Sequence, residues 1–100
     1  MKLYYNCGCE VIDQPSAEDI ARILGEEEDF VILSEAENSM SYLQFSFQED
    51  GGLEYQDGSL ERHFRATGVT TPDEVIVAFQ EYAAGDGSWK SDFTWERIAI

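Results

Sequence analysis

The central part of the chain, residues 30–66, alternates between apolar and polar positions in the way typical of half-buried β-strands. The run SYLQFSFQ is the cleanest example, because leucine and phenylalanine occupy every second position between polar side chains. The earlier run FVIL is continuously apolar, which fits a strand covered on both faces. Two Asp-Gly pairs, at 50–51 and 57–58, favour the tight turns of β-hairpins. The pattern predicts a four-stranded antiparallel meander over residues 30–66.

The N-terminal part of the chain predicts a short strand followed by a helix. Residues 2–5 (KLYY) are β-prone, and the strand can continue into the run CEVI after Gly8. A 3.6-residue apolar period then indicates an amphipathic helix at about 16–25. Ser16 is a suitable N-cap for this helix, and we expect Gly25 to end it.

The C-terminal part predicts a second helix and a closing strand. A helical period runs over about 72–84, with proline at the first position. Thr71 and Glu74 have the spacing of a capping box. We expect the helix to end at Gly85 or Gly87. The alternating run SDFTWERIAI then predicts a final strand.

Two short helices and a half-buried sheet can bury their apolar faces only against one another. We therefore expect a single α+β domain over residues 1–100. It would be a two-layer sandwich, in which both helices cover one face of a mainly antiparallel sheet built from the meander and the terminal strands. The other face would keep these side chains near solvent: Tyr42, Gln44, Ser46, Gln56, His63 and Arg65.

The net charge of the chain affects the expected function more than any other feature of its composition. The chain has 21 Asp and Glu against six Lys and Arg, a formal net charge of −15. Nucleic acids and anionic membrane surfaces both require a positive footprint, so neither is an expected partner. A strong negative field instead favours rapid capture of a basic protein. The alternative is that the charge only keeps the protein in solution.

Other sequence features narrow the expected class. No apolar run approaches the ~20 residues that a membrane span needs, and the first residues lack the apolar stretch of a secretory signal. We therefore expect a cytoplasmic protein. Cys7 and Cys9 have no second cysteine pair with which to hold zinc, so reduced thiols are expected. No catalytic or phosphate-binding motif occurs, so we predict a protein that is not an enzyme and needs no cofactor or metal.

Surface acids and one aromatic residue are the candidates for contact with a basic partner. Trp89 lies in the polar segment GDGSWKSD, where it is either an exposed anchor or a side chain folded back over the end of the helix. Each acid could equally be an ordinary solvated charge. The candidate partner-binding residues are Glu26, Glu27, Glu28, Asp29, Glu35, Glu37, Asp86, Trp89 and Asp92.

An alternative site uses the sheet face away from the helices. Tyr42, Tyr55, His63 and Arg65 could bind a small ligand or support an enzyme there. The basic residues around His63 could instead pair with acids on neighbouring strands. A third alternative is an accessory subunit of a larger complex.

The second half of the chain also resembles a known family. The residues that carry the resemblance lie within about 51–97: Tyr55, Asp57, Gly58, Asp73, Glu74, Ala78, Phe79, Tyr82, Gly85, Trp95 and Glu96. In this order of hairpin, capped helix, glycine-containing loop and closing strand, the chain resembles small immunity proteins of bacterial polymorphic-toxin systems, of the Imm1-like type. The loop GDGSWKSDF is longer and more polar than in that pattern. The resemblance implies an inhibitor that binds and neutralises a cognate toxin.

Overall fold

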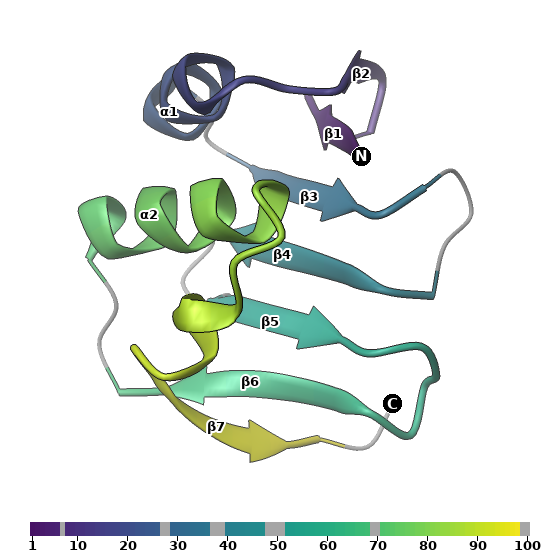
Figure 1. Ribbon diagram of the computed structural model, residues 1–100, viewed down its shortest axis with the longest axis vertical. Helices are drawn as coiled ribbons and strands as arrows, with labels where there is room; N and C mark the ends of the chain where they lie inside the picture. Colours follow the sequence, from purple (N-terminus) through teal and green to yellow (C-terminus); the bar gives the residue numbers. More distant parts are fainter. Residues whose placement is uncertain (7, 27–28, 37–39, 48–51, 69–70, 99–100) are drawn as a thin grey trace.

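The computed structural model describes residues 1–6, 8–26, 29–36, 40–47, 52–68 and 71–98. Its strands form one antiparallel sheet in the order β2-β1-β3-β4-β5-β6-β7 (Figure 1). The strands are β1 (Lys2–Tyr5), β2 (Glu10–Asp13), β3 (Phe30–Ser34), β4 (Tyr42–Ser46), β5 (Leu53–Gln56), β6 (His63–Thr67) and β7 (Thr94–Arg97). Strands β3 to β6 are neighbours in chain order, so the predicted meander is confirmed. The Asp-Gly pair at 50–51 lies outside the described residues.

The N-terminal strand differs from the prediction. Instead of continuing through Gly8, the chain reverses, and β2 pairs antiparallel with β1. Asn6 and Gly8 adopt φ of 55° and 82°, and the N–H of Gly8 donates to the carbonyl of Tyr5 at 3.1 Å. These left-handed conformations close a turn, which glycine and asparagine favour.

The first helix, α1 (Ala17–Glu26), begins as its sequence predicts. The N–H of Asp19 donates to Ser16 Oγ at 3.1 Å, and the N–H of Ser16 donates to Asp19 Oδ2 at 3.0 Å. Hydrogen bonding of the Asp19 carboxyl group by the Ser16 backbone, and then by the Ser16 side chain, holds the pKa of Asp19 below its usual range. The helix continues through Gly25 to Glu26, so the prediction that Gly25 ends it is wrong.

The second helix, α2 (Pro72–Ala83), carries the predicted capping box between Thr71 and Glu74. Its end is set by Gly85, whose φ of 77° reverses the chain. The N–H of Asp86 donates to the Glu81 carbonyl at 2.9 Å, and the N–H of Gly85 donates to the Tyr82 carbonyl at 3.1 Å. This pair of bonds is the Schellman arrangement, which satisfies carbonyls at a helix C-terminus.

One continuous core joins the helices to one face of the sheet, so the predicted two-layer α+β architecture is confirmed. Strands supply Leu3, Val31, Leu33, Leu43, Leu53 and Ala66. The helices supply Ile20, Ile23, Leu24, Val75, Ala78, Phe79 and Tyr82. After α2, a short 3₁₀ helix, η1 (Gly87–Lys90), lies in front of the sheet and adds Trp89 to this core (Figure 1). Within the described residues, neither α-helix is long and apolar enough to cross a membrane.

Two glycines test this account of helix termination. Both have open space where a Cβ would stand, but only Gly85 has a positive φ. Gly25→Ala should therefore stabilise the protein by about 0.5–1 kcal/mol, because alanine favours helix. Gly85→Ala should destabilise it by about 1–2 kcal/mol. Urea unfolding of both variants measures the difference, and equal effects would contradict the assigned helix ends.

Candidate functional site

The solvent side of α2 and the segment after it gather carboxylates that we call the acidic face: Asp73, Glu74, Glu81, Asp86 and Asp92. A surface hollow of about 410 Å³ is lined by the first two of these acids, by Asp92 and by Val77. Val77 is 44% exposed, which places one apolar side chain among the acids. None of the five carboxylates forms an ion pair with another described residue.

The helical period explains how this face is built. Positions 73, 74, 77 and 81 return to one side of α2, while the buried positions 75, 78, 79 and 82 face the sheet. Beyond the helix, Asp86 caps η1 by accepting hydrogen bonds from Ser88 N at 3.0 Å and from Ser88 Oγ at 2.6 Å. These bonds lower the pKa of Asp86, which keeps its carboxylate charged.

The pKa of Glu81 reflects the crowding of like charges on this face. Loss of solvent raises the pKa of its carboxyl group, and the charges of Asp92 and Asp86 raise it further. Its Oε2 atom is buried and has no hydrogen-bond partner among the described residues. Negative charge is therefore concentrated on this face, where no described cation forms an ion pair with these carboxylates.

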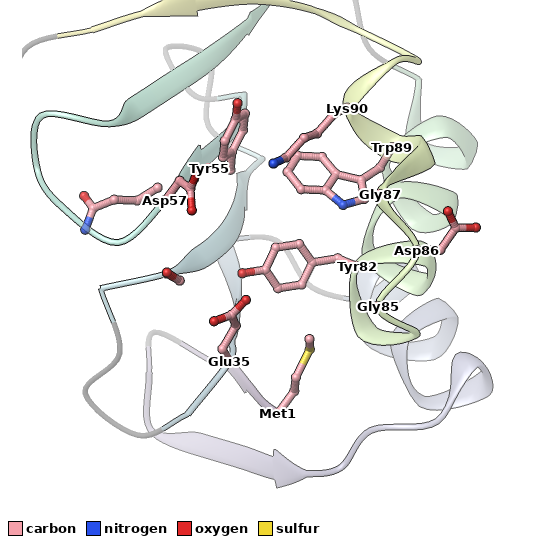
Figure 2. A pocket seen from close by; sticks show the side chains of 12 residues that line it. Met1, Glu35, Tyr55, Asp57, Tyr82, Gly85, Asp86, Gly87, Trp89 and Lys90 are labelled. Carbon is pink, nitrogen blue, oxygen red and sulfur yellow. The ribbon is translucent and has the colours of Figure 1, made fainter.

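A second feature, which we call the aromatic pocket, lies between the sheet and the end of α2 (Figure 2). Its volume is about 200 Å³. The rings of Tyr55, Tyr82 and Trp89 form its walls, with ring centroids 4.9 Å apart for Tyr55–Trp89 and 5.5 Å for Tyr82–Trp89. The charged side chains along it are Glu35, Asp57, Asp86 and Lys90, of which Asp86 points away from the cavity (Figure 2).

The structure brings together several of the residues that the sequence predicts for partner binding. Glu35 and Trp89 line the aromatic pocket, and Asp86 and Asp92 belong to the acidic face. Glu26 instead borders a separate hollow beside the β1–β2 turn.

Of the remaining predicted acids, the structure describes only Asp29. Asp29 is half-buried, and its backbone carbonyl accepts a hydrogen bond from the N–H of Phe47 at 2.8 Å. Glu27, Glu28 and Glu37 lie outside the described residues, as does Cys7. Cys9 is an exposed free thiol.

The burial of Trp89 decides between the two interpretations of its position. It is only 4% exposed and packs against Tyr55, Tyr82 and Trp95. The interpretation as an exposed anchor is therefore wrong, and the folded-back conformation is correct. Its burial follows from the 3₁₀ turn that Asp86 caps, which the polar sequence around it does not reveal.

The alternative site on the open sheet face also needs correction. Tyr55 lies on the helix side of the sheet, since it pairs with Leu43 and Phe64 and stacks on Phe64. His63 and Gln56 were expected near solvent, but they are only 4% and 3% exposed. Tyr42 is half-buried and Arg65 is exposed.

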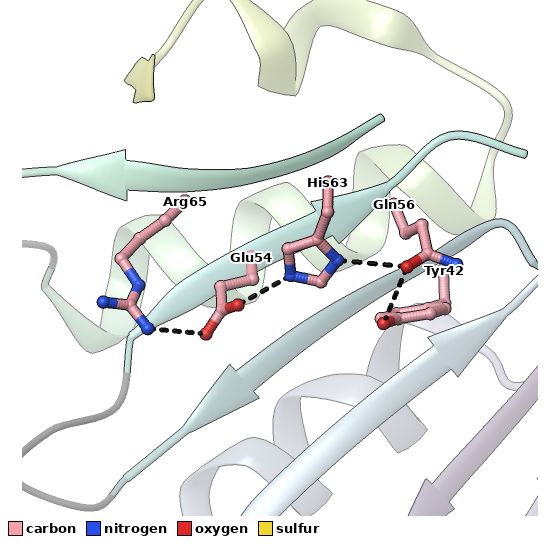
Figure 3. Close-up of polar contacts among 5 residues, drawn as sticks. All are labelled: Tyr42, Glu54, Gln56, His63 and Arg65. Carbon is pink, nitrogen blue, oxygen red and sulfur yellow. Dashed lines mark hydrogen bonds and ion pairs between the residues drawn. The ribbon is translucent and has the colours of Figure 1, made fainter. Parts of the chain in front are cut away.

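His63 is the centre of a polar network on that face (Figure 3). Its Nε2 lies 2.7 Å from Glu54 Oε1, and its Nδ1 lies 3.2 Å from Gln56 Oε1. Glu54 Oε2 also meets Arg65 Nη2 at 3.4 Å, and the Tyr42 hydroxyl donates to Gln56 Oε1 at 3.4 Å. Gln56 Nε2 donates to the Met40 carbonyl at 2.9 Å, which orients the amide oxygen toward His63.

The contacts of this network already engage both ring nitrogens of His63. Both ring nitrogens already lie within hydrogen-bond distance of oxygen atoms, so a ligand or metal ion would have to displace Glu54 or Gln56 to reach them. The interpretation that the basic residues pair with acids across the sheet is confirmed by Arg65 with Glu54, and by Arg62 with Asp57 at 2.8 Å. Sequence reasoning missed the role of Glu54, although strand alternation placed it on the same face as His63.

No protein-family model matches the chain, and comparison with curated proteins and with solved structures finds no match. The resemblance to immunity proteins therefore stays a prediction.

The network predicts the effect of removing Glu54. Glu54→Leu leaves His63 Nε2 without its acceptor in a buried position, which should destabilise the protein by about 1–3 kcal/mol. Glu96→Leu, a change at an exposed position on strand β7, which is separated from the strand of Glu54 by β6, is the matched control. Chemical unfolding of both variants measures the difference, and a Glu54→Leu protein as stable as the control would refute a structural role for the network.

Glu81 predicts a pH-dependent effect. Its pKa is raised in the folded protein, so the folded state loses stability as pH rises through that pKa. Glu81→Gln should therefore raise the melting temperature at neutral pH. The gain should disappear as pH falls below the ordinary range of a glutamate, where the wild-type side chain is neutral too.

Thermal melts between pH 3 and pH 8 test this expectation, with Glu61→Gln in the exposed turn before β6 as control. A gain that is constant across this range, or equal in the control, would show that Glu81 does not carry the crowded charge.

Proposed function

We propose that this protein is a small acidic binding domain that captures a basic protein partner through the acidic face. In its most concrete form, it is an immunity-type inhibitor that binds and neutralises a cognate toxin. The observation that carries the proposal is the gathering of five carboxylates on α2 and the segment after it, without an ion pair to any described residue.

The charge balance makes this arrangement suited to a basic partner. Six Lys and Arg cannot neutralise 21 acids, and four of the six already pair with acids away from the acidic face. A partner's lysines and arginines can supply the missing charge. Complementary fields also accelerate encounter and disfavour acidic competitors.

The rigidity of the face supports the same function. The capping box fixes one end of α2, and the Schellman turn and the capped η1 fix the other. Side chains on such a scaffold lose little freedom on binding, so less of the interaction energy is spent on ordering. Val77 offers an apolar contact within the ring of acids.

The immunity-type proposal has one further support, the resemblance over about residues 51–97. That range contains α2, η1 and the whole acidic face. An accessory subunit of a larger complex would use the same surface and differ only in its partner. A ligand-binding or enzymatic site on the open sheet face has less support, because His63 is buried and its nitrogens are engaged.

A capture experiment with charge-matched variants tests the proposal. The immobilised protein is incubated with extract of its native host at low and at high salt. We expect a basic protein to bind at low salt and to dissociate as salt rises, because screening weakens the attraction. The triple change Asp73→Asn, Asp86→Asn and Asp92→Asn should abolish capture, while asparagine can still cap η1.

The control removes the same charge elsewhere, through Glu10→Gln, Glu18→Gln and Glu61→Gln, all at exposed positions. It should retain the partner. Capture of an acidic protein, or equal loss with both triple variants, would contradict binding through the acidic face.

A further inference from the structure

The aromatic pocket contains a hydroxyl group, that of Tyr82, which points into it. Tyr82 is 8% exposed, and its ring extends from α2 into the cavity (Figure 2). Its hydroxyl group makes no hydrogen bond to any described residue, although its ring contacts Trp89. The oxygen opens onto the cavity, so it can accept a hydrogen bond from a donor that comes from outside.

Negative charge borders the same cavity. The carboxylates of Glu35 and Asp57 lie on the sheet side of the pocket (Figure 2). Burial raises the pKa of the Tyr82 hydroxyl, and the charges of Glu35 and Asp57 raise it further. Asp57 is paired with Arg62, whereas Glu35 forms no ion pair with a described residue.

Lys90 shows that the pocket can accommodate a cation. Its Nζ lies 5.5 Å from the ring centroid of Tyr55 and 5.5 Å from that of Trp89. Both distances are within the ~6 Å over which an aromatic face attracts a cation. Lys90 is exposed on η1, so its side chain can swing into solvent when another cation arrives.

We propose that the aromatic pocket receives a cationic side chain, arginine or lysine, of the basic partner, and that this side chain displaces Lys90. The inference rests on the proposed function, since it assigns one residue of the basic partner to one cavity. A volume of about 200 Å³ suits a single side chain. Pockets for whole small-molecule ligands are usually larger, about 300–1,000 Å³.

The chemistry of the walls explains the preference. The faces of Tyr55 and Trp89 attract the charge of the incoming group, and Glu35 neutralises it. The Tyr82 oxygen accepts a hydrogen bond from one of its N–H groups. A planar guanidinium can make all of these contacts at once, because it stacks on rings and donates in its own plane.

The test uses the full chain and N-acetyl-arginine amide as the probe, followed by two-dimensional NMR. The neutral citrulline counterpart, which has the same shape, is the control ligand. We expect the arginine probe to cause saturable shifts at the Trp89 indole N–H, and citrulline to cause none. Lys90→Gln should tighten binding about two- to fivefold, because it removes the competing cation.

Two further variants should act in the opposite sense. Glu35→Gln, at an exposed position, and Tyr82→Phe should each weaken the binding of the probe about two- to fivefold. Glu35→Gln decides the question alone if Tyr82→Phe fails to fold. Shifts of equal size with citrulline would overturn the proposal, as would weaker binding of the arginine probe to Lys90→Gln than to the wild type. The absence of a saturable shift in both the wild type and Lys90→Gln would overturn it as well.

The probe experiment and the capture experiment together distinguish a failure of the pocket inference from a failure of the proposed function. If the probe fails to bind while salt-sensitive capture still depends on the acidic face, only the inference about the pocket is wrong. If the probe binds as expected while capture ignores the acidic face, the pocket stands as a cation site and the proposed function is wrong.

Discussion

The packing of Trp89 is the interaction on which both the end of the acidic face and the aromatic pocket depend. Its ring packs against Tyr82 of α2, Tyr55 of β5 and Trp95 beside it, and so ties η1 to both layers. Large aromatic side chains contribute much of the energy of such cores. Without this anchor, the segment that carries Asp86 and Asp92 would have no fixed position, and the aromatic pocket would lose a wall.

The same packing determines where the charge lies. The buried side of α2 packs into the core, so Asp73 and Glu74 face solvent and only Glu81 is partly covered. The chain then turns at Gly85 and returns along the helix, which adds further carboxylates to those of α2. Four of the six Lys and Arg residues pair with acids away from this face. The excess charge is thereby presented on a rigid surface.

Local signals in the sequence predicted most of the fold. The capping box at Thr71 and the alternation in β4 each depend on residues close together in the chain. The tight turn predicted at Asp57–Gly58 is instead a longer connection over residues 57–62, because β6 begins only at His63. The site was less predictable. Asp86 and Asp92 were identified, but the burial of Trp89 and of His63 depends on side chains contributed by other strands and by α2. Alternation gives the side of a strand and cannot show what covers it.

The central claim is that negative potential is concentrated on the acidic face and beside the aromatic pocket. Paramagnetic relaxation of backbone amides by a cationic nitroxide, compared with a neutral one of the same size, measures the potential residue by residue. The account predicts the largest excess of the cationic effect at the amides of residues 73–77 and 81–92. An excess that is uniform over the surface, or greatest on the open face of the sheet, would contradict it.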